Sequence, residues 1–75
     1  MVSAHPKIRW QMGKTPETIA FVQEAAVACF TREDLTETEN YQLRAKIERL
    51  LDGSESIVEP ETVDDWLERL RDHYP

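Results

Sequence analysis

The segment 19–30 constrains the fold more than any other part of the chain, because it is apolar almost all the way round a helix. Gln23 and Glu24 are its polar residues. Its apolar side chains at helical spacing are Ile19, Val22, Ala26, Cys29 and Phe30, and those on the flanks are Phe21, Ala25 and Ala28. A helix of this kind normally lies at the centre of a core. Since a chain of 75 residues has little else to cover it, we expect either two further helices or another chain to do so.

The residues just before this segment mark the start of a helix. Thr15 is suited to accept a hydrogen bond from the free backbone N–H groups of the first turn. Pro16 is favourable at the first helical position, and Glu17 complements the positive end of the helix dipole. These signals predict a first helix over 15–30.

A second helix is bounded by equally local signals. Thr36 and Glu39 match the capping box, in which each side chain satisfies a backbone N–H of the other residue. Gly53 suits the left-handed position that ends many helices. One apolar stripe runs between these signals and consists of Leu43, Ile47, Leu50 and Leu51. The pattern predicts a helix over 36–52.

A third helix is expected near the C-terminus. Pro60 and Glu61 resemble the first turn of a helix. One face after them is apolar and consists of Val63, Trp66, Leu67, Leu70 and Tyr74. Asp65 and Arg69 have the i,i+4 spacing of a supportive ion pair. We therefore predict a helix over 60–73, with Trp66 as the main aromatic anchor of the core.

Together these elements predict an all-α fold, a compact three-helix domain with an extended N-terminal arm. The arm covers residues 1–14 and the single helical domain covers residues 15–75. We expect the core to consist of Ile19, Val22, Ala26, Phe30, Leu43, Ile47, Leu50, Val63, Trp66, Leu67 and Leu70. At this chain length the core is thin and the stability is marginal.

The arm itself allows two interpretations. Ile8, Trp10 and Met12 alternate with polar residues, as in a strand. The segment could pair with Ile57 and Val58 in a small ribbon, or it could be an extended tail whose Trp10 packs on the helices. Isolated two-stranded ribbons are marginal, so we favour the tail.

Catalysis, metal binding and membrane insertion are not indicated by the residue types present. His5, His73 and Cys29 do not have the spacing of a zinc site, and Cys29 has no second cysteine with which to form a disulfide. The glycines are too few for a phosphate-binding loop. No apolar stretch approaches the ~20 residues of a membrane span or forms the middle of a signal peptide. We therefore expect a cytoplasmic, non-enzymatic protein without a cofactor or a bound metal.

The charge is divided unevenly along the chain. Three bases give the first fourteen residues a charge of +3, whereas six bases and fifteen acids give the remainder −9. The negatively charged residues 15–75 are expected to repel nucleic-acid phosphate and to attract basic proteins. The leading hypothesis is a small acidic regulator or inhibitor that covers a basic surface of a larger partner protein. Its expected contact residues are Glu37, Glu39, Asp64, Asp65 and Glu68.

Two other functional classes stay open. The first helix, with its wide apolar surface at Phe21, Ala25 and Ala28, could form a homodimer or a larger assembly. A DNA-binding regulator would use Arg44, Lys46 and Arg49 of the second helix, although Glu48 and Asp52 are interleaved with them. The salt dependence of binding distinguishes the acidic regulator from the homodimer, because acid-driven binding weakens as ionic strength rises and apolar dimerisation does not. The acidic surplus could also serve solubility alone.

Overall fold

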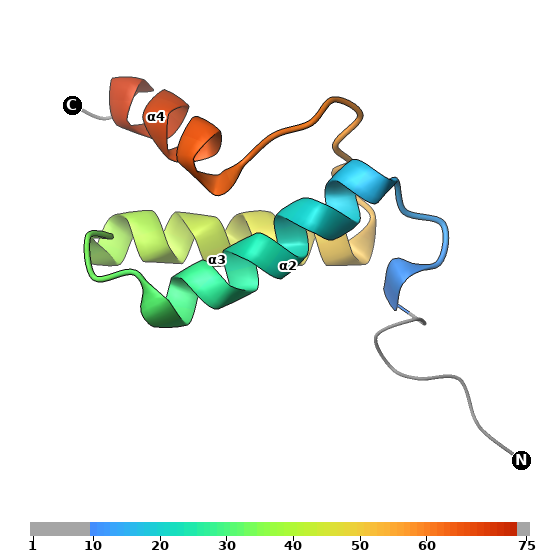
Figure 1. Ribbon diagram of the computed structural model, residues 1–75, viewed down its shortest axis with the longest axis horizontal. Helices are drawn as coiled ribbons and strands as arrows, with labels where there is room; N and C mark the ends of the chain where they lie inside the picture. Colours follow the sequence, from blue (N-terminus) through green and yellow to red (C-terminus); the bar gives the residue numbers. More distant parts are fainter. Residues whose placement is uncertain (1–9, 74–75) are drawn as a thin grey trace, which may run out of the picture.

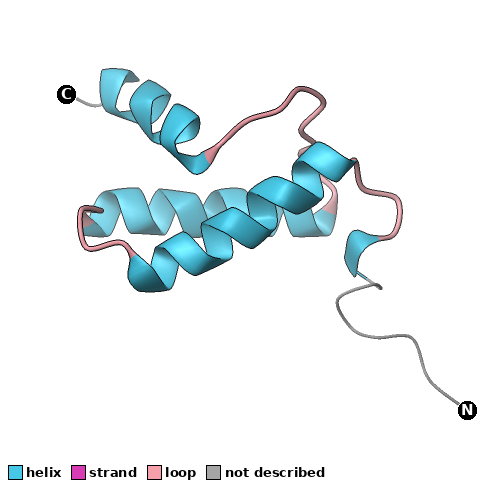
Figure 2. Ribbon diagram, viewed as in Figure 1, coloured by secondary structure: helices cyan, strands magenta, loops and turns pink. Residues whose placement is uncertain are grey.

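A computed structural model describes residues 10–73 and shows an all-α architecture, as predicted. Its helices are α2 (Pro16–Thr31), α3 (Glu37–Asp52) and α4 (Val63–His73), and the described range contains no strand. α2 and α3 form an antiparallel hairpin, and α4 lies across it after a long connection (Figures 1 and 2). Within the part of the chain that the structure describes, no helix is both long and apolar enough to cross a membrane.

The beginning of the described chain differs from the expected extended arm. Trp10 and Gln11 form a helical turn, so the strand pairing of Met12 with the 57–58 segment is not present. The rest of that proposal, including Ile8, lies outside the described residues. Trp10 is half-buried against the hydrophobic core, which confirms that its ring packs on the helices.

The first two helices begin and end where their local chemistry predicts. The Thr18 N–H donates to the Thr15 hydroxyl over 3.0 Å and caps α2. Both halves of the capping box between Thr36 and Glu39 are formed at 3.0 Å. Gly53 ends α3 with φ of 85°, a backbone conformation that side chains other than glycine rarely adopt.

The third helix starts later than predicted, at Val63 rather than at Pro60. The Thr62 hydroxyl accepts from the Asp65 N–H at 3.0 Å, and the Asp65 carboxylate accepts from the Thr62 N–H at 3.2 Å. This reciprocal cap fixes the start of the helix. The expected ion pair between Asp65 and Arg69 is absent, because Asp65 serves the cap and Arg69 pairs with Glu61.

The core confirms most of the predicted residues on α3 and α4, and Val22 on α2, and it corrects the other residues predicted on α2. Its buried residues are Phe21, Val22, Ala25, Ala28, Leu43, Leu50, Ile57, Val63 and Leu67. The predicted residues Ile47, Trp66 and Leu70 are partly buried against it. On α2, however, Ala26 and Phe30 are exposed and Ile19 is half-buried, whereas the flanking Phe21 and Ala25 are fully buried.

Polar side chains explain this rotation of α2. The buried Thr18 hydroxyl accepts from the Ile57 N–H at 2.9 Å, and the Thr15 hydroxyl donates to the Ile57 carbonyl. Glu24 accepts from the Val63 N–H at 3.3 Å, at the start of α4. These bonds hold the 53–62 connection and α4 against the side of α2 that carries Phe21. The opposite side is left uncovered.

Candidate functional site

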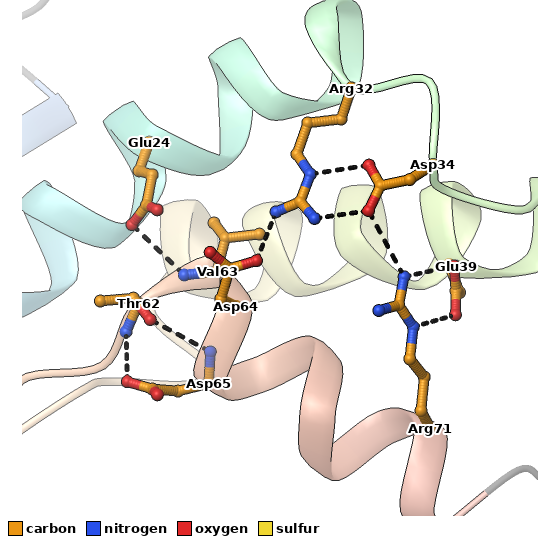
Figure 3. Close-up of polar contacts among 9 residues, drawn as sticks. All are labelled: Glu24, Arg32, Asp34, Glu39, Thr62, Val63, Asp64, Asp65 and Arg71. Carbon is orange, nitrogen blue, oxygen red and sulfur yellow. Dashed lines mark hydrogen bonds and ion pairs between the residues drawn. The ribbon is translucent and has the colours of Figure 1, made fainter.

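Two of the acidic residues expected to bind a partner, Glu39 and Asp64, lie in a network at the junction of the helices. This network, the polar seam, consists of Asp64, Arg32, Asp34, Arg71 and Glu39 (Figure 3). Anions and cations alternate along it. Arg32 follows the end of α2, Glu39 lies in the first turn of α3, and the other three come from the turn after α2 and from α4.

Glu39 has two structural roles in the seam. Its carboxylate accepts from the Arg71 guanidinium at 2.7 and 3.2 Å, and also from the Thr36 N–H. The hydrogen bond from Arg71, followed by that from Thr36, lowers the pKa of Glu39. Only 14% of its side chain is exposed. This carboxylate therefore holds α4 to the hairpin and has little surface to offer a partner.

Arg32 joins the other end of α4 to the hairpin. Its guanidinium donates to both carboxylate oxygens of Asp34, at 2.9 and 2.6 Å, and to Asp64 at 2.7 Å. The hydrogen bond from Arg32 lowers the pKa of Asp34 to about 2. Charge-assisted, bidentate pairs of this kind are geometrically specific.

The remaining predicted residues are not gathered into one site. Asp65 caps α4, while Glu37 and Glu68 are exposed and form no ion pair within residues 10–73. Asp64 keeps 76% of its side chain exposed, although Arg32 binds it. Three of the five predicted residues thus have structural partners. The seam's cations, Arg32 and Arg71, were not among the predicted residues, since their partners lie up to 32 residues away in the chain.

The bases of α3 are arranged in a way that does not favour phosphate binding. Lys46 is buried, forms ion pairs with Glu55 and Glu61, and lies 5.6 Å from the centre of the Phe21 ring. Arg49 pairs with Glu55 at 2.8 Å. Burial raises the pKa of Glu55, but Arg49 and Lys46 outweigh it and lower that pKa overall. Only Arg44 among the three bases considered for DNA binding lacks a carboxylate partner within the described chain.

A different surface emerges on the flank of the hairpin that faces away from α4. We call it the outer face, and its residues are Trp10, Ala26, Val27, Phe30, Ile47 and Leu51. Five of them, all except Phe30, line an open groove of about 610 Å³ together with Val22 and Gln23. Phe30 follows Ala26 by one helical turn and is 83% exposed, and Val27 is 61% exposed.

The rim of the outer face carries little charge. The Arg44 guanidinium lies 5.9 Å from the centre of the Phe30 ring, a cation–π geometry. Glu48 is exposed one turn further along α3. From Ala25 to Thr31, α2 contains no charged residue at all. The outer face is therefore an apolar strip between two helices, and its sequence signal was the excess apolar surface of 19–30.

Neither a metal-binding cluster nor a similarity to known proteins points to a further site. Within the described part of the chain, no three His, Cys, Asp or Glu side chains are grouped so that they could hold a metal ion. Comparison with models of known protein families, with curated proteins and with solved structures gave no match.

Proposed function

We propose that this protein is a non-catalytic protein-binding module and that the outer face is its contact surface. The observation that carries the proposal is the exposure of Phe30 and Val27 beside an apolar groove, on a chain whose core is thin. Contiguous exposed apolar surface with a polar rim is typical of protein interaction sites on soluble domains. Each Å² of it that a partner covers contributes about 25 cal/mol before the costs of association.

The arrangement of the helices supports this assignment. Val22, Ile47 and Trp10 already pack on the core from the groove side, so the groove floor is supported. Contacts built on helices keep their geometry better than contacts on loops. Phe30 supplies a large aromatic side chain, and such side chains contribute much of the energy of an interface when a partner buries them.

The acidic regulator remains a second prediction with a narrower basis. Glu37 and Glu68 are the predicted residues that are exposed and have no ion pair within residues 10–73, so they are the ones that could contact a basic surface. Reversing Asp64 and Asp65 would also remove a contact of Arg32 and the cap of α4. Replacing Glu37 and Glu68 by Lys is therefore the cleaner test, because a partner held by acidic contacts would then be lost while α4 stays capped.

Site-specific photo-crosslinking tests the role of the outer face in cells that naturally contain the protein. A photoreactive phenylalanine analogue would replace Gln23, which is exposed in the groove, or Glu68 on α4 as the control. We expect a discrete protein adduct from position 23 and none from position 68. Adding Phe30→Ala and Leu51→Ala to the position-23 variant should abolish the adduct. The same adducts from both positions, or none from position 23, would contradict the proposal.

A further inference from the structure

We propose that the partner on the outer face is a second copy of this chain, in a dimer with two-fold symmetry. This inference rests on the proposed function and names the occupant of the same surface. In such a dimer, any residue i that contacts residue j of the partner is matched by j contacting i. The face must then complement itself in both shape and charge.

The shape of the outer face meets this condition. Phe30 projects from one end of it, and the groove lined by Gln23, Ala26 and Leu51 occupies the rest. α2 and α3 run antiparallel, with Phe30 beside Arg44 and with Ala26 and Ile47 sharing the groove. A two-fold axis near Val27 and the middle of α3 would carry each Phe30 ring to the Gln23 end of the other copy's groove. One ring and one groove per chain then satisfy both halves of the interface.

The charges of the outer face also allow it to complement a second copy of itself. Two chains that each carry −6 repel one another over most of their surfaces. The outer face is the exception, because its α2 half is neutral and its α3 rim has one base, Arg44, and one acid, Glu48. Neither forms an ion pair within residues 10–73. The axis that seats the Phe30 ring also brings Arg44 of each copy to Glu48 of the other, which gives two identical ion pairs.

Charge reversal tests the proposed pairing of Arg44 with Glu48 of the other copy. Arg44→Glu gives a rim with two acids, and Glu48→Arg gives a rim with two bases. Sedimentation equilibrium should show that the natural chain is dimeric and that each variant alone is more weakly associated. An equimolar mixture of the two variants should restore the dimer, since every acid then faces a base of the other chain. Glu68→Arg makes the same charge change on α4 and should leave the natural dimer intact.

Removal of the ring tests the shape argument independently. Phe30→Ala should raise the dimer dissociation constant by roughly 30-fold or more, as for an interface hot spot. Phe30 is largely exposed within one chain, so circular dichroism should show unchanged helix content. A dimer that is insensitive to Phe30→Ala, or variants whose mixture stays as weak as each alone, would overturn the inference.

The outcome also separates this inference from the proposed function. A natural chain that is monomeric at every concentration, but that crosslinks from position 23 to a different protein, refutes the second copy and leaves the binding module standing. A monomer that also yields no adduct from position 23 refutes both. A self-adduct of twice the chain mass, together with the restored mixed dimer, supports both.

Discussion

The two sides of α2 are equally apolar in sequence but differ completely in the folded chain. The inner side, with Phe21, Ala25 and Ala28, is buried by α3, α4 and the connection that contains Ile57. The outer side, with Ala26, Val27 and Phe30, is exposed. Hydrophobicity alone did not decide which side went inward. Hydrogen bonds that Thr18 and Glu24 accept from the Ile57 and Val63 N–H groups hold the rest of the chain on one side, and the other side is left available for binding.

The largest contrast between inner and outer surfaces is expected at two neighbouring leucines of α3. Leu50 is fully buried, whereas Leu51 lies on the outer face and is 41% exposed. Leu50→Asp should abolish the thermal unfolding transition, because it would bury an unpaired charge in the core. Leu51→Asp should leave a folded chain that no longer associates. A cooperative transition that survives in Leu50→Asp would mean that the inner side is wrongly assigned.

The same contrast can be measured along α2 with one chemical change at two positions. Phe21→Ala should lower the free energy of unfolding by about 3–5 kcal/mol, the usual cost of removing a buried aromatic ring. Phe30→Ala should change the stability of the single chain by no more than about 0.5 kcal/mol. Urea denaturation at low protein concentration measures both. Equal losses at the two positions would contradict the difference between the sides.

A smaller effect is expected from the polar bond that orients the helix. Thr18→Val keeps the shape of the side chain but leaves the buried Ile57 N–H without its acceptor, at a cost of about 1–3 kcal/mol. Thr31→Val removes an exposed hydroxyl of the same helix, which donates to the Val27 carbonyl. This change should lower the free energy of unfolding by less than about 0.5 kcal/mol. Chemical denaturation compares the two variants. If both cost the same, Thr18 does not determine which side of α2 is buried.

The smallest effect concerns the polar seam and is seen in acid. Arg32 and Arg71 lower the pKa of Asp34 and Glu39 in the folded chain, so both carboxylates favour the folded state above their unfolded pKa near 4. This contribution is lost as the pH falls from about 4 towards 2. Trp66 fluorescence, followed in a Trp10→Phe background, should report loosening of α4 over that range. Glu39→Gln keeps an acceptor for the cap and should reduce the acid response, whereas an unaltered response would place its origin outside the seam.

The parts of the fold that follow from neighbouring residues could be predicted well from the sequence. The predicted ends of α2 and α3 agree with the structure to within one residue, because Thr15, Thr36 and Gly53 cap the helix turns next to them. α4 was predicted to start too early, since Pro60 is compatible with a helix start but the cap formed by Thr62 and Asp65 is the one realised.

The rotation of α2 and the site depended on residues far apart in the chain. A helix that is apolar all round has no preferred inner side, and the bond from Ile57 to Thr18 spans 39 residues. The acidic contact residues follow from the surplus of acids along the sequence, and this surplus does not show that Glu39 pairs with Arg71 or that Asp64 pairs with Arg32. The expectation that the first helix has surplus apolar surface was sound, but the residues named for it, Phe21, Ala25 and Ala28, are the buried ones.

The bonds from Thr15 and Thr18 to Ile57 also have a consequence for the order of folding. α2 and α3 are joined by a short turn, so their pairing closes a small loop at little entropic cost. The Ile57 bonds close a much larger loop and need both helices to be in place. We therefore expect the hairpin to form early in the transition state, and the connection and α4 to dock after it. Variants of Thr18 should then speed unfolding while leaving the rate of folding nearly unchanged.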